Sequence, residues 1–459
     1  MLQHKLQNLF DEPACGKNRA KDEKARRKGC GGKPLTPGNA AGGCAFDGAK
    51  IVLQPIADAA HLVHGPIACE GNSWDSRHAL SSGPMLYRTG FTTDMGELDV
   101  VYGGEKRLYR AIKEIVARYD PPAVFVYQTC VTAMIGDDIE KVCDAATERL
   151  GRPIIAVNAP GFVGKKNFGT KIAGEVLLNK VIGTEEPEFT TPTDINLIGE
   201  YNVSGDLWNV TPLLSRLGIR LLSAITGDAR FHDLTKAHRA RVNMMVCSQA
   251  LINVARKMEE RWGIPWFEGS FYGVPETSKS LRTLAKMLVD RGAPDDLIAR
   301  TETLISAEEA RVAGELADIL PALRGKRALL YTGGVKSWSM IAALQWAGMT
   351  VIGTSVRKAT ADDKTRAAGL MGEEGDLYES LPQAQMYEKL KVGEADIMLS
   401  GGRTQYVALK AKVPWLDSNQ ERHTAYEGYD GAIALLKGIH KALTNPIWAQ
   451  VRAAPPWEE

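Results

Sequence analysis

Short apolar runs alternate with amphipathic helical patterns along most of the chain. Of all the sequence features, this alternation restricts the possible folds most strongly. The runs are four to seven residues long, and we expect eight strands: Ala123–Tyr127, Ile154–Val157, Ile195–Gly199, Arg220–Thr226, Val242–Val246, Arg327–Tyr331, Thr350–Gly353 and Asp396–Leu399. Strands that alternate with helices predict parallel sheets covered by helices on both faces. The sequence therefore predicts an α/β protein built from Rossmann-like domains.

The helical patterns between these runs place apolar residues on one face. In Gly104–Tyr119 that face carries Leu108, Ala111, Ile112, Ile115 and Tyr119. The further predicted helices are Asp137–Leu150, Ser248–Trp262, Ser278–Arg291, Ala307–Leu323, Ser337–Trp346 and Gly431–Leu443.

The length of 459 residues predicts several domains, because single cores stop growing near about 250–300 residues. We expect α/β domains at 44–205, 206–326 and 327–459, with boundaries after Glu185–Thr193 and Leu320–Gly325. Residues 1–43 form a basic, Gly- and Pro-rich arm that is either solvated or docked on a partner subunit. Cys15 and Cys30 lie in this arm, either as free thiols or as transient iron ligands.

Composition excludes several classes of function. Lys plus Arg number 56 against 55 Asp plus Glu, so the strongly basic balance of a nucleic-acid-binding protein is absent. No apolar run approaches the roughly 18 residues of a membrane span, and Met1–Phe10 lacks the apolar core of a secretory signal. We therefore expect a cytoplasmic protein whose seven cysteines are thiols, either inert and buried or used as metal ligands.

Four cysteines stand in contexts that suit metal binding. Cys44 and Cys69 are flanked by glycines, which let the backbone approach a bulky inorganic cluster. Cys130 follows a strand and precedes a helix start, which favours the thiolate. Their spacings of 25 and 61 positions include no local CxxC clip, so three buried thiols remain an alternative. Cys247 ends the predicted strand Val242–Val246 and is either a core residue or an anchor for one metal atom.

Three longer motifs resemble one known family. Gly43–Ala49 reads GCAFDGA, Ala60–Cys69 reads AHLVHGPIAC, and Tyr87–Asp94 reads YRTGFTTD. These segments are similar to the nitrogenase molybdenum–iron protein family, and the similarity runs from about residue 43 to about residue 445. Within that family they are most similar to the subunits that assemble the cofactor. The resemblance implies three α/β domains, with clusters at their meeting point and at the subunit interface.

The resemblance also implies roles for the cysteines. Cys44, Cys69 and Cys130 would hold a 4Fe–4S cluster, completed by a cysteine of a homologous NifN-like partner in a heterotetramer. Cys247 would anchor an iron–sulfur precursor of the iron–molybdenum cofactor. The implied function is that of a scaffold that holds the precursor while molybdenum and homocitrate are added. The implied partners are a NifB-type cluster donor, the nitrogenase iron protein and apo-nitrogenase as acceptor. The sequence has no G-x-x-x-x-G-K-[ST] loop, so ATP would be used by the iron protein.

Departures from the catalytic subunit favour a scaffold over a nitrogenase α-type subunit or a related tetrapyrrole reductase. Ser418 or Asn419 stands where the catalytic family places a second cofactor ligand, a His, before the motif Tyr426–Gly431. His423 is out of register and is either a ligand or a surface or capping residue. The segment Gly161–Lys171 lacks the substrate-side His, and Lys336 replaces an Arg. A cofactor bound by a single thiolate dissociates more easily than one bound by two protein ligands. An ordinary α/β oxidoreductase with inert thiols is the third alternative.

Basic and amide side chains predict a lining for an anionic cluster and a polycarboxylate. This predicted lining comprises Lys165, Lys166, Asn167, Lys171, Lys336 and Arg403, together with Ser418 and Asn419. Ordinary solvated loop charges are the alternative for each lysine and arginine.

Overall fold

The computed structural model describes residues 43–454 except 75–78, 357–358, 373–374, 380 and 420–421. The predicted arm up to residue 42, with Cys15 and Cys30, lies outside the described residues. Residues 43–459 form one compact unit. The predicted boundaries near 205 and 326 therefore stay predictions. Among the described residues, no helix is both long enough and apolar enough to cross a membrane.

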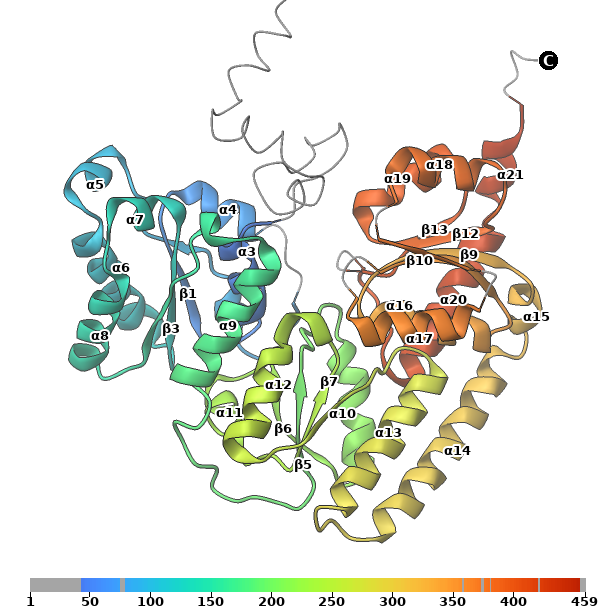
Figure 1. The fold of residues 1–459 in the computed structure, drawn as a ribbon, viewed down its shortest axis with the longest axis horizontal. Helices are drawn as coiled ribbons and strands as arrows, with labels where there is room; N and C mark the ends of the chain where they lie inside the picture. The colour runs from blue at the N-terminus through green and yellow to red at the C-terminus, as the bar shows by residue number, and fades with distance from the viewer. Residues whose placement is uncertain are drawn as a thin grey trace, which may run out of the picture. The chain divides into compact units, whose positions relative to one another are not determined.

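The first sheet has the strand order β2-β1-β3-β4. Figure 1 shows its central strands, β1 and β3, side by side. Its strands are β1 Ala60–His64, β2 Phe91–Thr92, β3 Val124–Gln128 and β4 Ile154–Val157. The α-helices in this part are α3 Ala45–Leu53, α4 Ile67–Trp74, α5 Glu97–Tyr102, α6 Glu105–Tyr119, α7 Cys130–Ile135, α8 Ile139–Leu150 and α9 Lys166–Lys180. The short 3-10 turns are η2 Leu86–Arg88 and η3 Gly161–Val163.

The second sheet has the order β6-β5-β7-β8. Its strands are β5 Asp194–Ile198, β6 Arg220–Ile225, β7 Val242–Met245 and β8 Trp266–Glu268. The helices are α10 Asp206–Arg216, α11 Phe231–Thr235, η4 Ala237–Arg239, α12 Ser248–Trp262, α13 Val274–Val289, α14 Asp296–Leu316 and α15 Leu320–Leu323. Strand β5 lies on the N-terminal side of position 205 but pairs with β6 and β7.

The third sheet has the order β11-β10-β9-β12-β13. Its strands are β9 Arg327–Tyr331, β10 Thr350–Ser355, β11 Asp376–Tyr378, β12 Ile397–Ser400 and β13 Trp415–Asp417. The helices are α16 Val335–Trp346, α17 Ala361–Met371, α18 Gln383–Lys391, η5 Gly402–Thr404, α19 Gln405–Lys410, α20 Gly428–Thr444 and α21 Ile447–Arg452.

Every strand pair in the three sheets is parallel, so the predicted fold class is confirmed. The apolar cores explain why the strands are apolar on both faces. One core covers the first sheet under α6 and α8. A second core joins the other face of that sheet, through α3, α9 and α12, to the second sheet. A third core joins the second sheet to the third.

All eight predicted strands are present, but five strands lie outside the predicted runs. Four of these, β2, β8, β11 and β13, have only two or three residues. The fifth, β1, is fully buried but contains His61 and His64, which interrupt its apolar pattern. Both histidines are paired inside the core: His61 Nδ1 lies 2.9 Å from the Tyr127 hydroxyl, and His64 Nε2 lies 3.0 Å from Asp137 Oδ2.

The helix predicted at Ala307–Leu323 is wrong in its bounds. The structure has the 21-residue helix α14, Asp296–Leu316, followed by the separate turn α15. The first turns of α14 contain several polar residues, which weakened the periodic apolar pattern in the sequence. Leu297, Thr301 and Leu304 nevertheless form the buried face of these turns.

Candidate metal centre

Cys44 and Cys130 face the same glycine. Cys44 precedes α3 as its N-cap, and Cys130 is the first residue of α7, directly after β3 and Thr129. A methyl group built on Gly161, in η3 after β4, would lie 2.9 Å from Cys130 Sγ and 3.1 Å from Cys44 Sγ. The two sulfur atoms are therefore no further apart than these two distances together. Any side chain at Gly161 would enter the space in front of both thiols.

Cys69, on α4, belongs to the same group. Its pKa is raised above the ordinary value, first by burial and then by the negative charges of Cys130 and Cys44. A bound metal would supply the positive charge that favours the Cys69 thiolate. Cys130 is exposed, whereas Cys44 and Cys69 are partly exposed. The group is therefore open to a further ligand from outside the chain.

Cysteine thiolates are the ligands that iron–sulfur clusters take in proteins. Among the described residues, no three His, Cys, Asp or Glu side chains converge as ligands of one metal ion. In an iron–sulfur cluster each cysteine binds a different iron, so its ligands stand further apart than those of a single ion. The three thiols and the space in front of Gly161 fit such a cluster. When bound, the cluster would supply one-electron transfer.

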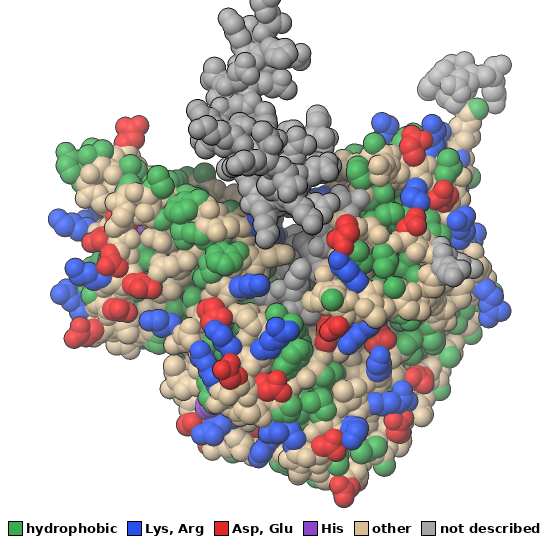
Figure 2. All heavy atoms as spheres, in the orientation of Figure 1, with side chains coloured by type: hydrophobic (Ala, Val, Ile, Leu, Met, Phe, Trp, Pro, Cys, Tyr) green, Lys and Arg blue, Asp and Glu red, His purple; other side chains and the backbone are tan. Residues whose placement is uncertain are grey.

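Exposed apolar side chains lie close in sequence to the cysteines and to Gly161. Ile67, Met134 and Phe162 lie within four residues of Cys69, Cys130 or Gly161, and all three are more than half exposed. Helix α5, which contacts α7, exposes Leu98, Val101 and Tyr102. Figure 2 shows hydrophobic side chains gathered over α5 and its neighbours. Apolar patches of this kind mark contacts with other proteins.

Cys247 lies apart from the three-cysteine group, at the end of the second sheet. It follows β7 and is the N-cap of α12, and it is partly exposed. Gly199, directly after β5, has a φ of +89°, and a methyl group there would lie 2.7 Å from Cys247 Cβ. Glycine thus lets the two strand ends touch. Carboxyl ends of parallel strands are where α/β folds gather their ligands.

The predicted lining residues of α9 reach from Cys44 toward α12. Lys165 forms a backbone bridge with Cys44, and the Lys166 ammonium lies 3.5 Å from Asp47. The backbone carbonyl of Asn167 accepts a hydrogen bond from Thr170 Oγ1 at 2.8 Å. Farther along, the carbonyl of Lys171 accepts one from Asn253 on α12. The structure thus places Lys165 and Lys166 beside Cys44.

The other predicted lining residues gather at the carboxyl edge of the third sheet. Arg403 is in η5, directly after β12. Ser418 follows β13, and its fully buried hydroxyl has no hydrogen-bond partner among the described groups. The Asn419 backbone N–H donates to Asp417 Oδ1 at 2.7 Å. His423 is exposed, which agrees with its interpretation as a surface residue.

Lys336 lies in a buried group of charges that sequence reasoning missed. Its ammonium is 4.9 Å from the centre of the Tyr272 ring. Burial, and next the charge of Arg422, lower the pKa of Lys336, whereas Asp206, Glu427 and Glu200 raise it. On balance the pKa of Lys336 is lowered, because burial outweighs the nearby carboxylates. Glu200 directly follows Gly199 at the end of a predicted strand, and this position is the sequence feature that could have marked it as a site residue.

Asp206 and Arg422 form the centre of this buried charge group. Both Arg422 Nη atoms donate to the Asp206 carboxylate, and Arg422 Nη2 also lies 3.0 Å from the Tyr272 hydroxyl. The Asp206 carboxylate accepts the backbone N–H of Tyr426 at 2.8 Å as well. Asp206 thus ties the segment after β13 to the end of the second sheet.

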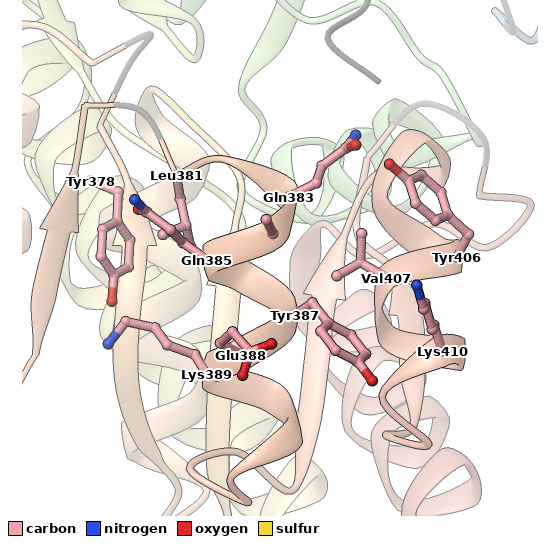
Figure 3. Close-up of a pocket in the computed structure, with 11 residues that line it drawn as sticks. Tyr378, Leu381, Gln383, Gln385, Tyr387, Glu388, Lys389, Tyr406, Val407 and Lys410 are labelled. Atoms are coloured by element: carbon pink, nitrogen blue, oxygen red, sulfur yellow. The ribbon is translucent and has the colours of Figure 1, made fainter. Parts of the chain in front are cut away.

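A separate groove of about 660 Å³ lies beside α18 and α19, on the third sheet (Figure 3). Tyr378, Tyr387, Tyr406, Lys389 and Lys410 are among its lining residues. None of the predicted site residues lines it, so it is not the cysteine site.

Residues 44–444 match the profile of the nitrogenase component 1 type oxidoreductases. The chain belongs to this family. It is 59% identical, over 99% of its length and 83% of the relative's, to the nitrogenase iron–molybdenum cofactor biosynthesis protein NifE of Bradyrhizobium diazoefficiens. It is 51% identical to the NifE protein of Klebsiella pneumoniae, with 98% of each chain covered. A solved structure of nitrogenase Cp1 matches it with a TM-score of 0.84 at 27% identity, covering 93% of each chain.

The resemblance read from the cysteine motifs is thus confirmed at the level of the nitrogenase component 1 family. The family match begins at Cys44, so the basic arm lies before it. The ligand roles of Cys44, Cys69, Cys130 and Cys247 stay predictions, as do those of the lining residues.

Glu427 makes stability depend on pH in this family member. Its pKa is raised well above the ordinary 4.5, by burial first and then by the charges of Glu200 and Asp206. The folded protein therefore keeps a proton that the unfolded chain loses near pH 4.5. Stability falls as pH rises above that value, by up to about 1.4 kcal/mol per pH unit for one proton.

We expect Glu427→Gln to lessen this fall, because a neutral amide donates to Glu200 without titrating. Thermal unfolding at pH 5.5 and pH 8 measures the difference. Glu302→Gln is the control, since Glu302 is partly exposed and Arg282 lowers its pKa. An unchanged loss of stability between the two pH values in Glu427→Gln would contradict the assignment of the proton.

Proposed function

We propose that this chain is a scaffold subunit for maturation of the nitrogenase iron–molybdenum cofactor. It would hold an iron–sulfur precursor while molybdenum and homocitrate are inserted, and then donate the product to apo-nitrogenase. The observation that carries the proposal is the 51–59% identity, over nearly the whole chain, to relatives named as proteins of this biosynthesis. The separation of Cys247 from the three-cysteine group supports it, since a resident cluster and a cargo need different sites.

In this proposal Cys44, Cys69 and Cys130 hold a resident 4Fe–4S cluster. The exposed Cys130 and the apolar rim of Ile67, Met134 and Phe162 suit a NifN-like partner that supplies the fourth cysteine within a heterotetramer. The exposed face of α5 offers a contact for the nitrogenase iron protein. An electron donor docked there would stand close to Cys130, because α5 packs on α7. Thiolate ligation of this kind suits a cytoplasmic location, where cysteines stay reduced.

The cargo in this proposal is the iron–sulfur precursor supplied by a NifB-type donor. The Cys247 thiolate would hold one of its iron atoms. The unpartnered hydroxyl of Ser418 and the cation of Arg403 at the third sheet are candidates to bind the organic acid or the cluster sulfides. Ser418 or Asn419, where the catalytic family places a His, leaves the precursor with one strong protein ligand. A single ligand favours release to the acceptor.

A catalytic nitrogenase α-type subunit is the alternative, favoured by the TM-score of 0.84 to nitrogenase Cp1. The test uses the complex with its partner, purified without oxygen. A scaffold binds iron and sulfide, and it activates apo-nitrogenase when molybdenum, homocitrate, iron protein and ATP are supplied. An iron-free complex contradicts both functions. Ammonia formation by the complex itself, at the rate of nitrogenase, contradicts the scaffold.

A further inference from the structure

A buried ion pair joins the helices that position Cys44 and Cys69. Lys50 stands on α3, the helix that Cys44 caps, and is 1% exposed. Its ammonium contacts the carboxylate of Glu70 and donates to Ser73 Oγ at 2.9 Å. Glu70 is the residue after Cys69, and both Glu70 and Ser73 belong to α4. Lys50, on the helix that follows Cys44, thus binds the helix that carries Cys69.

Helix α3 is firmly fixed in the protein. All nine of its residues are buried. Its first turn is clamped to the chain before α9, because the Ala45 N–H donates to the Gly164 carbonyl and the Lys166 N–H donates to the Gly43 carbonyl. A methyl group on Gly48 would lie 1.9 Å from the carbonyl oxygen of Lys166, so the two helices are in direct contact. Lys50 therefore projects from a rigid base.

Helix α4 buries few of its described side chains, although Cys69 packs on the core between the first and second sheets. Ile67 and Ala68 are exposed, and Cys69 is only partly buried. Among the described side chains of α4, Glu70 and Ser73 alone are buried, and both bind Lys50. The polar contacts of Glu70 and Ser73 to one ammonium thus help to set the rotation of α4, and with it the direction of the Cys69 thiol.

Burying charges is costly, which indicates that the ion pair of Lys50 and Glu70 has a role beyond stability. Replacing a buried ion pair by apolar groups of similar volume is often neutral or stabilising, whereas removing one partner is strongly destabilising. Stability alone is therefore a weak reason to keep Lys50 and Glu70. Unlike apolar packing, the pair is directional, because hydrogen bonds constrain both distance and angle. Asp47, one turn before Lys50 and paired with Lys166, adds a further carboxylate near the ammonium.

We propose that Lys50 is a positioning residue for the three-cysteine site: by binding Glu70 and Ser73 it sets the orientation of α4, and so the place of Cys69 Sγ relative to Cys44 and Cys130. This inference rests on the proposed resident cluster. It concerns side chains behind the cysteines, which would not themselves touch the cluster.

The test compares Lys50→Met with the double variant Lys50→Met/Glu70→Met in the complex with its partner, purified without oxygen. Lys50→Met leaves a buried carboxylate unpaired, so we expect lower thermal stability and loss of at least half of the resident cluster's iron. The double variant removes both charges, so we expect its unfolding temperature to return to near that of the wild type. Its reduced 4Fe–4S signal in electron paramagnetic resonance should still be shifted or broadened, with a changed midpoint potential.

Lys257→Met is the matched control, since it breaks a more exposed ion pair between α9 and α12, and it should leave iron content and spectrum unchanged. A stable double variant with native spectrum, potential and iron content would overturn the positioning role. If the wild-type complex itself holds no iron, the proposed function fails instead. The two failures are therefore distinguishable.

Discussion

Cys247→Ala abolishes retention of the cofactor precursor and leaves the resident 4Fe–4S cluster in place: this is the largest functional effect we expect. Cys247 follows β7 of the second sheet as the N-cap of α12, whereas Cys44 and Cys130 meet at Gly161 beside the first sheet. Alanine removes the single proposed thiolate ligand but keeps the close contact between Cβ and Gly199. The fold and the three-cysteine group should therefore be unaffected.

Iron analysis and electron paramagnetic resonance of the complex, purified without oxygen, measure this effect. The precursor's iron should be lost while the signal of the reduced 4Fe–4S cluster keeps its intensity, and activation of apo-nitrogenase should fall to background. Cys143→Ala is the matched control, because Cys143 is buried in the first sheet's core and its pKa is raised to about 12. Simultaneous loss of both iron populations in Cys247→Ala would contradict the separation of cargo and resident sites.

Asp206→Ala should give the largest loss of stability. Asp206 and Arg422 are both buried, and the carboxylate also accepts the backbone N–H of Tyr426. Removing it leaves a buried guanidinium without its ion-pair partner, which costs about 3–5 kcal/mol. Because Asp206 joins the start of α10 to the segment after β13, we also expect faster proteolysis of that segment.

Chemical unfolding measures this loss, and Glu302→Ala is its control. Glu302 and Arg282 form an ion pair in which both side chains are nearly half exposed, and such pairs contribute about 0–1 kcal/mol. A decrease below about 1 kcal/mol in Asp206→Ala would show that water or another carboxylate compensates the buried Arg422 guanidinium.

Some of the fold could be predicted because its signals are local. The runs at Ile154–Val157 and Arg327–Tyr331 have the same bounds in the structure, and so does the helix Ser248–Trp262. Strand β1 could not be predicted in this way, because His61 and His64 are polar in the sequence but paired in the core. Their partners, Tyr127 and Asp137, lie more than 60 positions away, beyond any local pattern.

The candidate site was predictable in its residues but not in its arrangement. Glycines beside Cys44 and Cys69 marked both as candidates, yet the shared glycine of Cys44 and Cys130 is Gly161, which belongs to neither motif. Likewise, Lys336 stood out as a lone basic residue, whereas the structure surrounds it with Glu200, Asp206 and Glu427. These neighbours come from distant parts of the chain, so a local sequence pattern does not reveal them.

By itself, the sequence determined the alternation of strands and helices, the parallel sheets and the family resemblance of the cysteine motifs. These follow from apolar periodicity and from residue order, which are properties of neighbouring residues. Only the tertiary structure decided that Cys44, Cys69 and Cys130 form one group, that Cys247 stands apart, and that Lys50 holds α4. These facts depend on contacts between residues far apart in the chain, which form only when the sheets share their cores.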